Sequence, residues 1–303
     1  MVLERIALTG SSGMLGRHIT HVLIKNNYEV LASSRTRTPI KHVNLKWKYL
    51  DLSKKLNYII LDRIFGKVSA IIHVGAYVPY FGKKLNSKKL IRCNVYATDK
   101  IAKWANKRKI HFIYISGAII YKNQDKINSE NSKILKFSTN KYCYSKILSE
   151  KKLLLKKKTG LTLTIFRPSS IYGWGLSKFR GISNLMVLAQ KKTHIKLYDV
   201  NKTKVNLIHA YDVSTAVLKS LQNGITGIFN LGNYDVKNFY NIAVIFNQIF
   251  KNKKKITIAK KKIKNFPTNK LNVKIIMAKK ILNWKPNVSL KKGLTLMACK
   301  KCI

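Results

Sequence analysis

The segment TGSSGMLG, residues 9–16, is the feature that most constrains how this chain can fold. It follows the apolar run Arg5–Thr9, a predicted strand, and precedes apolar residues at helical spacing (Ile19, Val22 and Leu23). In such a strand–turn–helix unit the glycines permit a tight turn, close approach of the backbone to a pyrophosphate, and close helix–strand packing. Free N–H groups at the helix N-terminus then attract phosphate. The segment therefore predicts a phosphate-binding loop containing Gly10, Ser12, Gly13, Met14, Leu15 and Gly16.

Apolar runs and helical patterns alternate along the rest of the chain. Strands are predicted at 29–33, near Tyr49, and at 70–74, 111–115, 162–167, 207–210 and 228–231, and helices at about 86–107 and 142–158. This order indicates an α/β fold with a Rossmann-type, doubly wound parallel sheet. We expect residues 1–165 to form the nucleotide-binding domain, with strands near 205–232 returning to it. Residues 166–303 are expected to form mainly the substrate-binding part.

Tyr142 and Lys146 stand four residues apart in the helical segment that precedes the strand predicted at 162–167. Residues at this spacing share one face of a helix. A nearby ammonium favours the phenolate and so lowers the pKa of a phenol. The pair therefore predicts a general acid/base, Tyr142, assisted by Lys146.

Further motifs follow in order. Residues 167–175 read RPSSIYGWG, residues 209–213 read HAYDV and residues 282–286 read LNWKP. Together with TGxxGxxG and YxxxK, they resemble the extended short-chain dehydrogenases/reductases, the NAD-dependent epimerase/dehydratase family, from residue 3 to about 295. The resemblance is to the branch with nucleotide-sugar epimerases and dihydroflavonol-reductase-like proteins. It implies an NAD(P)-dependent enzyme that transfers hydride at a carbonyl/alcohol carbon of a sugar-nucleotide-like or small ketone substrate.

The resemblance also implies where the cofactor lies. Besides the loop and the Tyr–Lys pair, it implies cofactor contacts by Asp51, Leu52, Gly75, Ala76, Asn94 and Pro168. At the end of the second strand, NAD enzymes usually carry a carboxylate for the ribose hydroxyls. Ser34 stands at that position and Arg35 follows it. Because these residues could bind a 2′-phosphate, we expect NADP(H), with NAD as the alternative.

One catalytic position departs from the family pattern. A Ser or Thr four residues before Tyr121 would hold the reacting oxygen, but Gly117 stands there and Ser116 precedes it. Our hypothesis is that Ser116 substitutes in part, or that Tyr142 and water hold the oxygen. Neighbouring strand residues point to opposite faces, so Ser116 would need a local bulge. The alternative is a catalytically impaired dinucleotide-binding protein.

The charge is unusual, since 60 Lys+Arg against 11 Asp+Glu give a net charge of +49 among 303 residues. Such a field attracts nucleic acid and anionic membranes. The lysines are spread along the whole chain, a pattern typical of AT-rich coding sequence, and no nucleic-acid-binding motif is present; polyanion binding is the weaker alternative. We expect a cytoplasmic protein with a small-molecule substrate, a possible homodimer, no specific nucleic acid, no membrane partner and no metal.

Overall fold

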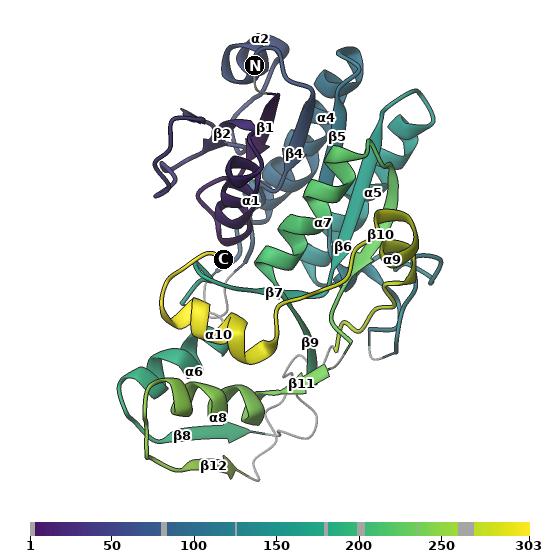
Figure 1. Cartoon of the computed structure of the whole chain (residues 1–303). Helices are drawn as coiled ribbons and strands as arrows, with labels where there is room; N and C mark the ends of the chain where they lie inside the picture. Colours follow the sequence, from purple (N-terminus) through teal and green to yellow (C-terminus); the bar gives the residue numbers. More distant parts are fainter. Residues whose placement is uncertain are drawn as a thin grey trace.

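The computed structural model describes residues 4–79, 84–124, 126–178, 181–198, 204–234, 236–259 and 270–303. Its centre is a seven-stranded parallel sheet in the order β10-β6-β5-β4-β1-β2-β3 (Figure 1). The strands are β1 (Arg5–Thr9), β2 (Glu29–Ser34), β3 (Leu45–Tyr49), β4 (Ala70–His73), β5 (His111–Ile115), β6 (Leu163–Pro168) and β10 (Gly227–Leu231). The predicted doubly wound α/β fold is thereby confirmed.

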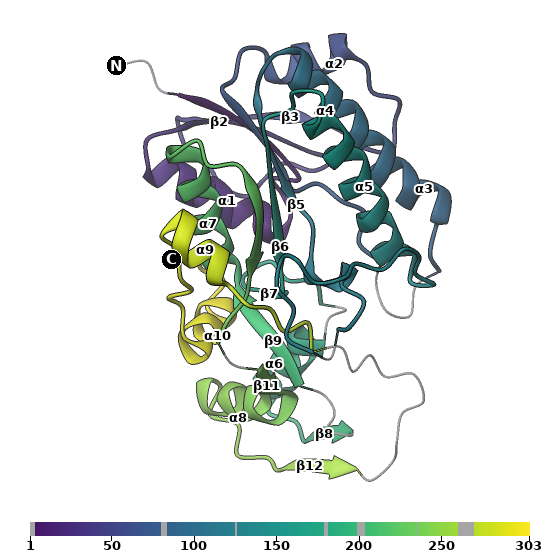
Figure 2. The same cartoon turned by 90° about the vertical axis from the view of Figure 1, so that its right-hand side faces the viewer.

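Helices cover both faces of this sheet, as Figure 2 shows. One face carries α1 (Met14–Lys25), α7 (Ala210–Gln222) and α9 (Ile276–Leu282), and the other carries α2 (Tyr58–Phe65), α4 (Ala97–Lys107) and α5 (Lys141–Lys157). The central strands are buried on both sides, which explains why their sequences read as continuous apolar runs. The sheet therefore separates two hydrophobic cores.

The helix predicted over 86–107 is interrupted. It begins as α3 (Ser87–Ile91), passes through a π-helical stretch, η1 (Arg92–Tyr96), and continues as α4. Single π-helical turns inside helices are often found at functional sites. This one presents Asn94, a predicted cofactor contact, to the neighbouring elements.

A smaller layer lies below the carboxyl ends of the strands (Figure 1). It contains a three-stranded sheet of β7, β9 and β11, a two-stranded sheet of β8 and β12, and the helices that pack on them. Its elements are β7 (Ser170–Tyr172), α6 (Gly181–Gln190), β8 (Ile195–Tyr198), β9 (Lys204–His209), β11 (Val236–Asn238), α8 (Phe239–Ile249), β12 (Ile256–Ala259) and α10 (Leu290–Ala298).

The later segments divide differently from the sequence expectation. β10 joins the main sheet beside β6, but β9 pairs with β7 and β11 instead, and Ala210 begins α7 rather than ending a strand. The α9 region packs on the α1–α7 core through Ala278, Leu282 and Trp284, although it was assigned to the substrate side. The strand expected at 207–210 is confirmed as the end of β9, and only Ala210 differs, because a short strand and a buried helix start look alike. The boundary at residue 165 stays a prediction. Among the helices of the described ranges, none is long and apolar enough to cross a membrane.

Candidate active site

The glycine loop has the geometry that a diphosphate requires. Gly10 adopts φ +74°, and a Cβ there would lie 2.7 Å from the backbone of Gly75; at Gly16 a Cβ would collide with the carbonyl of Gly10. Gly13 is exposed, and within the described part of the chain a Cβ at this position would meet only the Gly10 carbonyl oxygen, at 3.3 Å. Met14, Leu15 and Gly16 form the first turn of α1, where backbone N–H groups have no partner inside the helix. The residues present therefore fit a bound diphosphate.

At the end of β2 the Ser34 hydroxyl is fully engaged. It donates to the carbonyl of Thr36 at 2.7 Å, accepts from Trp47 Nε1 at 3.0 Å and lies 3.0 Å from Ser11 Oγ. A buried hydroxyl with one donor hydrogen has nothing left to offer a ligand. Arg35 is exposed beside it. Burial raises the pKa of the Asp51 carboxyl, but hydrogen bonds from Ser53 and, after them, the charge of Arg35 lower it below its usual value. Any contact with a 2′-phosphate therefore falls to Arg35 rather than to Ser34.

A chain of hydrogen bonds holds the loop after β4. Thr9 Oγ1 accepts from the backbone N–H of Gly75 at 3.1 Å and lies 2.7 Å from His73 Nδ1. On the other side of the ring, His73 Nε2 lies 2.9 Å from Thr98 Oγ1. Burial lowers the pKa of His73 to about 3, and the charge of Lys146 adds to this effect, so the ring is neutral. His73 is therefore structural, and it fixes the backbone of Gly75 that leads into Ala76.

Asn94 forms three hydrogen bonds within the protein. Its Oδ1 accepts from the backbone N–H of Tyr77 at 2.7 Å, and its Nδ2 donates to the Tyr77 carbonyl and to Ser145 Oγ, both at 3.0 Å. This side chain joins the loop after β4 to α5. A direct cofactor contact by Asn94 stays a prediction: both N–H groups of the amide are engaged, and Oδ1 keeps one acceptor site.

Tyr142 and Lys146 lie in the first turns of α5, which Asn140 caps by accepting from the N–H groups of Tyr142 and Cys143. Lys146 is buried, and its Nζ donates to the carbonyl of Ile115 at 2.8 Å. The same Nζ lies 4.8 Å from the centre of the Tyr114 ring and 5.9 Å from that of Tyr142. Burial lowers the pKa of Lys146 to about 8, while the Glu150 carboxylate raises it. The structure thus brings together the two residues of the predicted pair.

Ser116 and Gly117 lie directly after β5, where α5 contacts the chain on both sides of them. Lys146 binds the carbonyl before Ser116, and Cys143 Sγ donates to the carbonyl of Ile119 at 3.1 Å. Among the described residues, nothing forms a hydrogen bond with Ser116 Oγ, although this oxygen is buried. Gly117 has an extended backbone at φ 172°, and a Cβ there would meet its nearest neighbours only at 3.7 and 3.9 Å. A Cβ at residue 117 therefore has room.

Two of the later motifs are joined to each other. Asp212, within HAYDV, accepts from the backbone N–H groups of Asn287 and Val288 at 2.9 and 3.2 Å, and its own carbonyl accepts from Trp284 Nε1 at 3.0 Å. These hydrogen bonds join the HAYDV segment, at the start of α7, to the LNWKP segment and the two residues that follow it. Pro168 ends β6, and its carbonyl lies beside Gly117. Sequence reasoning missed Thr9 and Tyr77, whose roles depend on contacts between distant segments.

Comparison with known proteins agrees with this arrangement. Residues 6–232 match the sequence model of the NAD dependent epimerase/dehydratase family. UDP-glucuronic acid decarboxylase 6 of Arabidopsis thaliana is 22% identical over 305 residues, which cover 97% of this chain and 87% of that protein. Epimerase Mth375 of Methanothermobacter thermautotrophicus superposes with a TM-score of 0.86 at 19% identity, over 98% of this chain and 92% of that one. MoeE5, solved in complex with UDP-glucuronic acid and NAD, gives a TM-score of 0.82 at 19% identity, over 98% of both chains. At these identities the structural likenesses show the fold alone.

The family match covers most of the chain, which therefore belongs to the NAD-dependent epimerase/dehydratase family of enzymes, as its motifs predict.

Proposed function

We propose that this protein transfers hydride between NADP(H) and a carbonyl/alcohol carbon of a nucleoside diphosphate sugar or a related small ketone. The observation that carries the proposal is the buried Lys146 ammonium beside Tyr142, on a helix that contacts the segment after β5. Relatives support the substrate class, since MoeE5 was solved with UDP-glucuronic acid and NAD.

In this proposal Tyr142 exchanges a proton with the reacting oxygen, and Lys146 favours the phenolate that this exchange produces. The nicotinamide ring, when bound, gives or takes the hydride. Gly13 and the first turn of α1 would hold the diphosphate. The Gly75–Ala76 backbone, which Thr9 Oγ1 fixes by accepting from the Gly75 N–H, would border the cofactor. Asp51 and Leu52 are proposed to border the adenine, and Lys146 to hold the nicotinamide ribose.

The preference for NADP(H) rests on the end of β2. A carboxylate is absent at Ser34, and Arg35 presents a cation to solvent at that place. A guanidinium pairs well with a phosphate, whereas a carboxylate there would repel it. NAD is the competing cofactor, because it is the one named in the structures of MoeE5.

A single-turnover experiment tests the reaction. The enzyme is mixed with reduced or oxidised cofactor and a panel of UDP-sugars and ketones, and absorbance of the reduced nicotinamide is followed. We expect a transient or lasting change with wild type that Tyr142→Phe slows by about 100-fold or more. Tight cofactor binding with no hydride transfer to any substrate would favour the catalytically impaired alternative, which the glycine at position 117 suggests.

A further inference from the structure

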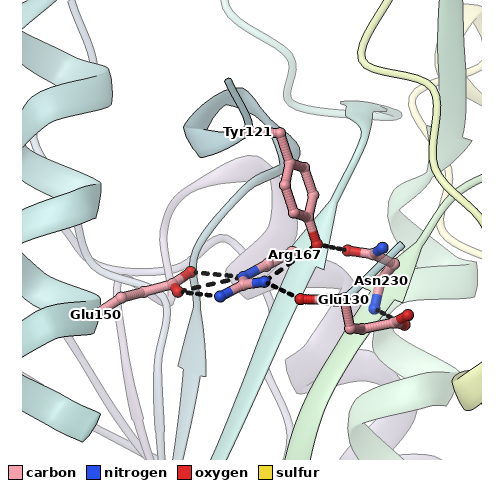
Figure 3. Close-up of polar contacts among 5 residues, drawn as sticks. All are labelled: Tyr121, Glu130, Glu150, Arg167 and Asn230. Atoms are coloured by element: carbon pink, nitrogen blue, oxygen red, sulfur yellow. Dashed lines mark hydrogen bonds and ion pairs between the residues drawn. The ribbon is translucent and has the colours of Figure 1, made fainter. Parts of the chain in front are cut away.

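A buried ion pair between Glu150 and Arg167 joins α5 to β6, four residues along α5 from Lys146 of the proposed proton-transfer pair. Arg167 Nε lies 3.1 and 3.2 Å from the two carboxylate oxygens of Glu150, and its Nη2 lies 2.7 Å from one of them (Figure 3). The two side chains are only 2% and 3% exposed. Burying two charges is costly unless they are paired and hydrogen-bonded, so such a pair calls for an explanation.

The guanidinium is fixed from further sides. Arg167 Nη1 donates to Tyr121 Oη at 3.1 Å and to the carbonyl of Glu130 at 3.2 Å. Tyr121 in turn donates to Asn230 Oδ1 at 2.6 Å, on the neighbouring strand β10 (Figure 3). The Glu150 carboxylate raises the pKa of Arg167 against the effect of burial, so the arginine stays charged. Arg167 therefore holds the Glu150 carboxylate at a fixed place.

Glu150 follows Lys146 by four residues on α5, which places both side chains on one face of the helix. From the sheet, Tyr114 and His73 also face the Lys146 ammonium. Neither carries charge near neutral pH, because burial raises the pKa of Tyr114 and lowers the pKa of His73 to about 3. Within the described part of the chain, Glu150 is thus the source of negative charge that acts on Lys146.

We propose that Glu150 is a positioning residue for the proton-transfer pair: its carboxylate, fixed by Arg167, keeps Lys146 charged beside Tyr142. This inference rests on the proposed function. The Tyr142–Lys146 pair can lose its first proton from either group. If Tyr142 loses it, the pair is a phenolate beside an ammonium; if Lys146 loses it, the pair is a phenol beside a neutral amine. Measured as rise along the helix, Glu150 lies about 6 Å from Lys146 and about 12 Å from Tyr142, so its charge acts more strongly on Lys146 and favours the first form.

The test is a tyrosinate titration by ultraviolet absorbance, which requires no substrate. The Tyr142 signal is the difference between each protein and the same protein carrying Tyr142→Phe. In Glu150→Gln we expect the midpoint of Tyr142 to rise by about one pH unit or more, because the amide has the same shape but no charge. In Glu150→Asp, which keeps the charge on a shorter side chain, we expect the midpoint to return most of the way.

This order separates charge from packing. If the carboxylate only fills space, the shorter Asp should perturb the titration more than the isosteric Gln, and that result would overturn the proposal. Asp99→Asn, which removes a negative charge paired with Lys156 on the same helical layer, is the control and should leave the midpoint unchanged.

The role of Glu150 and the role of the Tyr142–Lys146 pair can be refuted separately. A low wild-type midpoint that Glu150→Gln leaves in place would remove the role of Glu150 alone. A wild-type midpoint at the ordinary value of about 10 would remove both that role and the Tyr142–Lys146 pair on which the proposed function depends.

Discussion

Lys146 Nζ donates a 2.8 Å hydrogen bond to the carbonyl of Ile115, the last residue of β5. The bond anchors a buried ammonium at the strand end where Ser116 and Gly117 follow, and it does so from the helix that carries Tyr142. The bond therefore keeps α5, which carries the proposed proton donor Tyr142, close to Ser116 and Gly117, the segment expected to hold the reacting oxygen.

Replacing this ammonium should abolish the chemistry. In Lys146→Met we expect single-turnover hydride transfer to fall by about 100-fold or more, because the phenolate of Tyr142 loses its stabilising charge. Lys151→Met, an exposed substitution on the same helix, is the matched control. Equal rates for the two variants would exclude Lys146 from the reaction.

The glycine at position 117 offers a gain-of-function experiment. Among the described residues, a Cβ there would meet no atom closer than 3.7 Å, and the backbone is extended. Gly117→Ser should therefore fold and supply the missing hydroxyl. A single well-placed donor is worth about 100-fold in rate, so we expect an increase approaching that size. Gly117→Ala adds the same Cβ without the hydroxyl and should leave the rate unchanged; a similar increase in both would contradict this reading.

The role of Ser116 can be tested in the same assay. Its buried hydroxyl has no hydrogen-bond partner among the residues that the structure describes, so it can bind a substrate or a water molecule. If Ser116 substitutes in part for the absent residue, Ser116→Ala should slow hydride transfer by about tenfold or more. Undiminished turnover would rule out the substitution and leave water and Tyr142 to hold the oxygen.

Cofactor preference should depend on one arginine. We expect Arg35→Ser to weaken NADPH binding by about tenfold or more, through the loss of a charge-assisted contact, with little effect on NADH. Lys41→Ser removes another exposed cation nearby in sequence and controls for the general field of this basic protein. Losses of equal size for both cofactors, measured by fluorescence titration, would show that Arg35 does not read the 2′-phosphate.

Three buried histidines should make the fold acid-sensitive. Burial lowers the pKa of His18 and His73 to about 3 and that of His209 to about 4, against 6.5 in the unfolded chain. Between these values the unfolded chain binds more protons, so the unfolding free energy is fully retained above about pH 6.5 and falls as the pH drops toward 4. The loss amounts to roughly 1.4 kcal/mol per pH unit for each histidine.

Chemical denaturation at pH 7, 6 and 5 measures this loss. His18→Gln should reduce the slope of the unfolding free energy against pH, and the exposed His42→Gln should not. Identical slopes in all three proteins would mean that His18 does not titrate as its burial requires.

Features that depend on local sequence could be predicted, whereas contacts between distant segments could not. The doubly wound α/β fold and the places of most strands follow from short, local patterns, and these predictions are confirmed. The roles of the glycine loop and of the Tyr142–Lys146 pair stay predictions. The engaged hydroxyl of Ser34, the Thr9–His73 chain and the Glu150–Arg167 pair join residues that lie far apart in the chain, and single-sequence periodicity carries no information about such contacts. The strand β9 was expected, but its pairing with β7 and β11 outside the main sheet was not, since strand pairing depends on the partner as well as on the strand.

The central claim is that the glycine loop binds a nicotinamide dinucleotide, and a fluorescence titration of the purified protein with NADPH and NADH tests it most directly. Gly13→Asp, which places a carboxylate where the diphosphate would approach the backbone, is the control. We expect saturable binding of both cofactors, tighter for NADPH, that the control loses. Binding of neither cofactor at low micromolar concentration, or binding that Gly13→Asp leaves intact, would contradict the account.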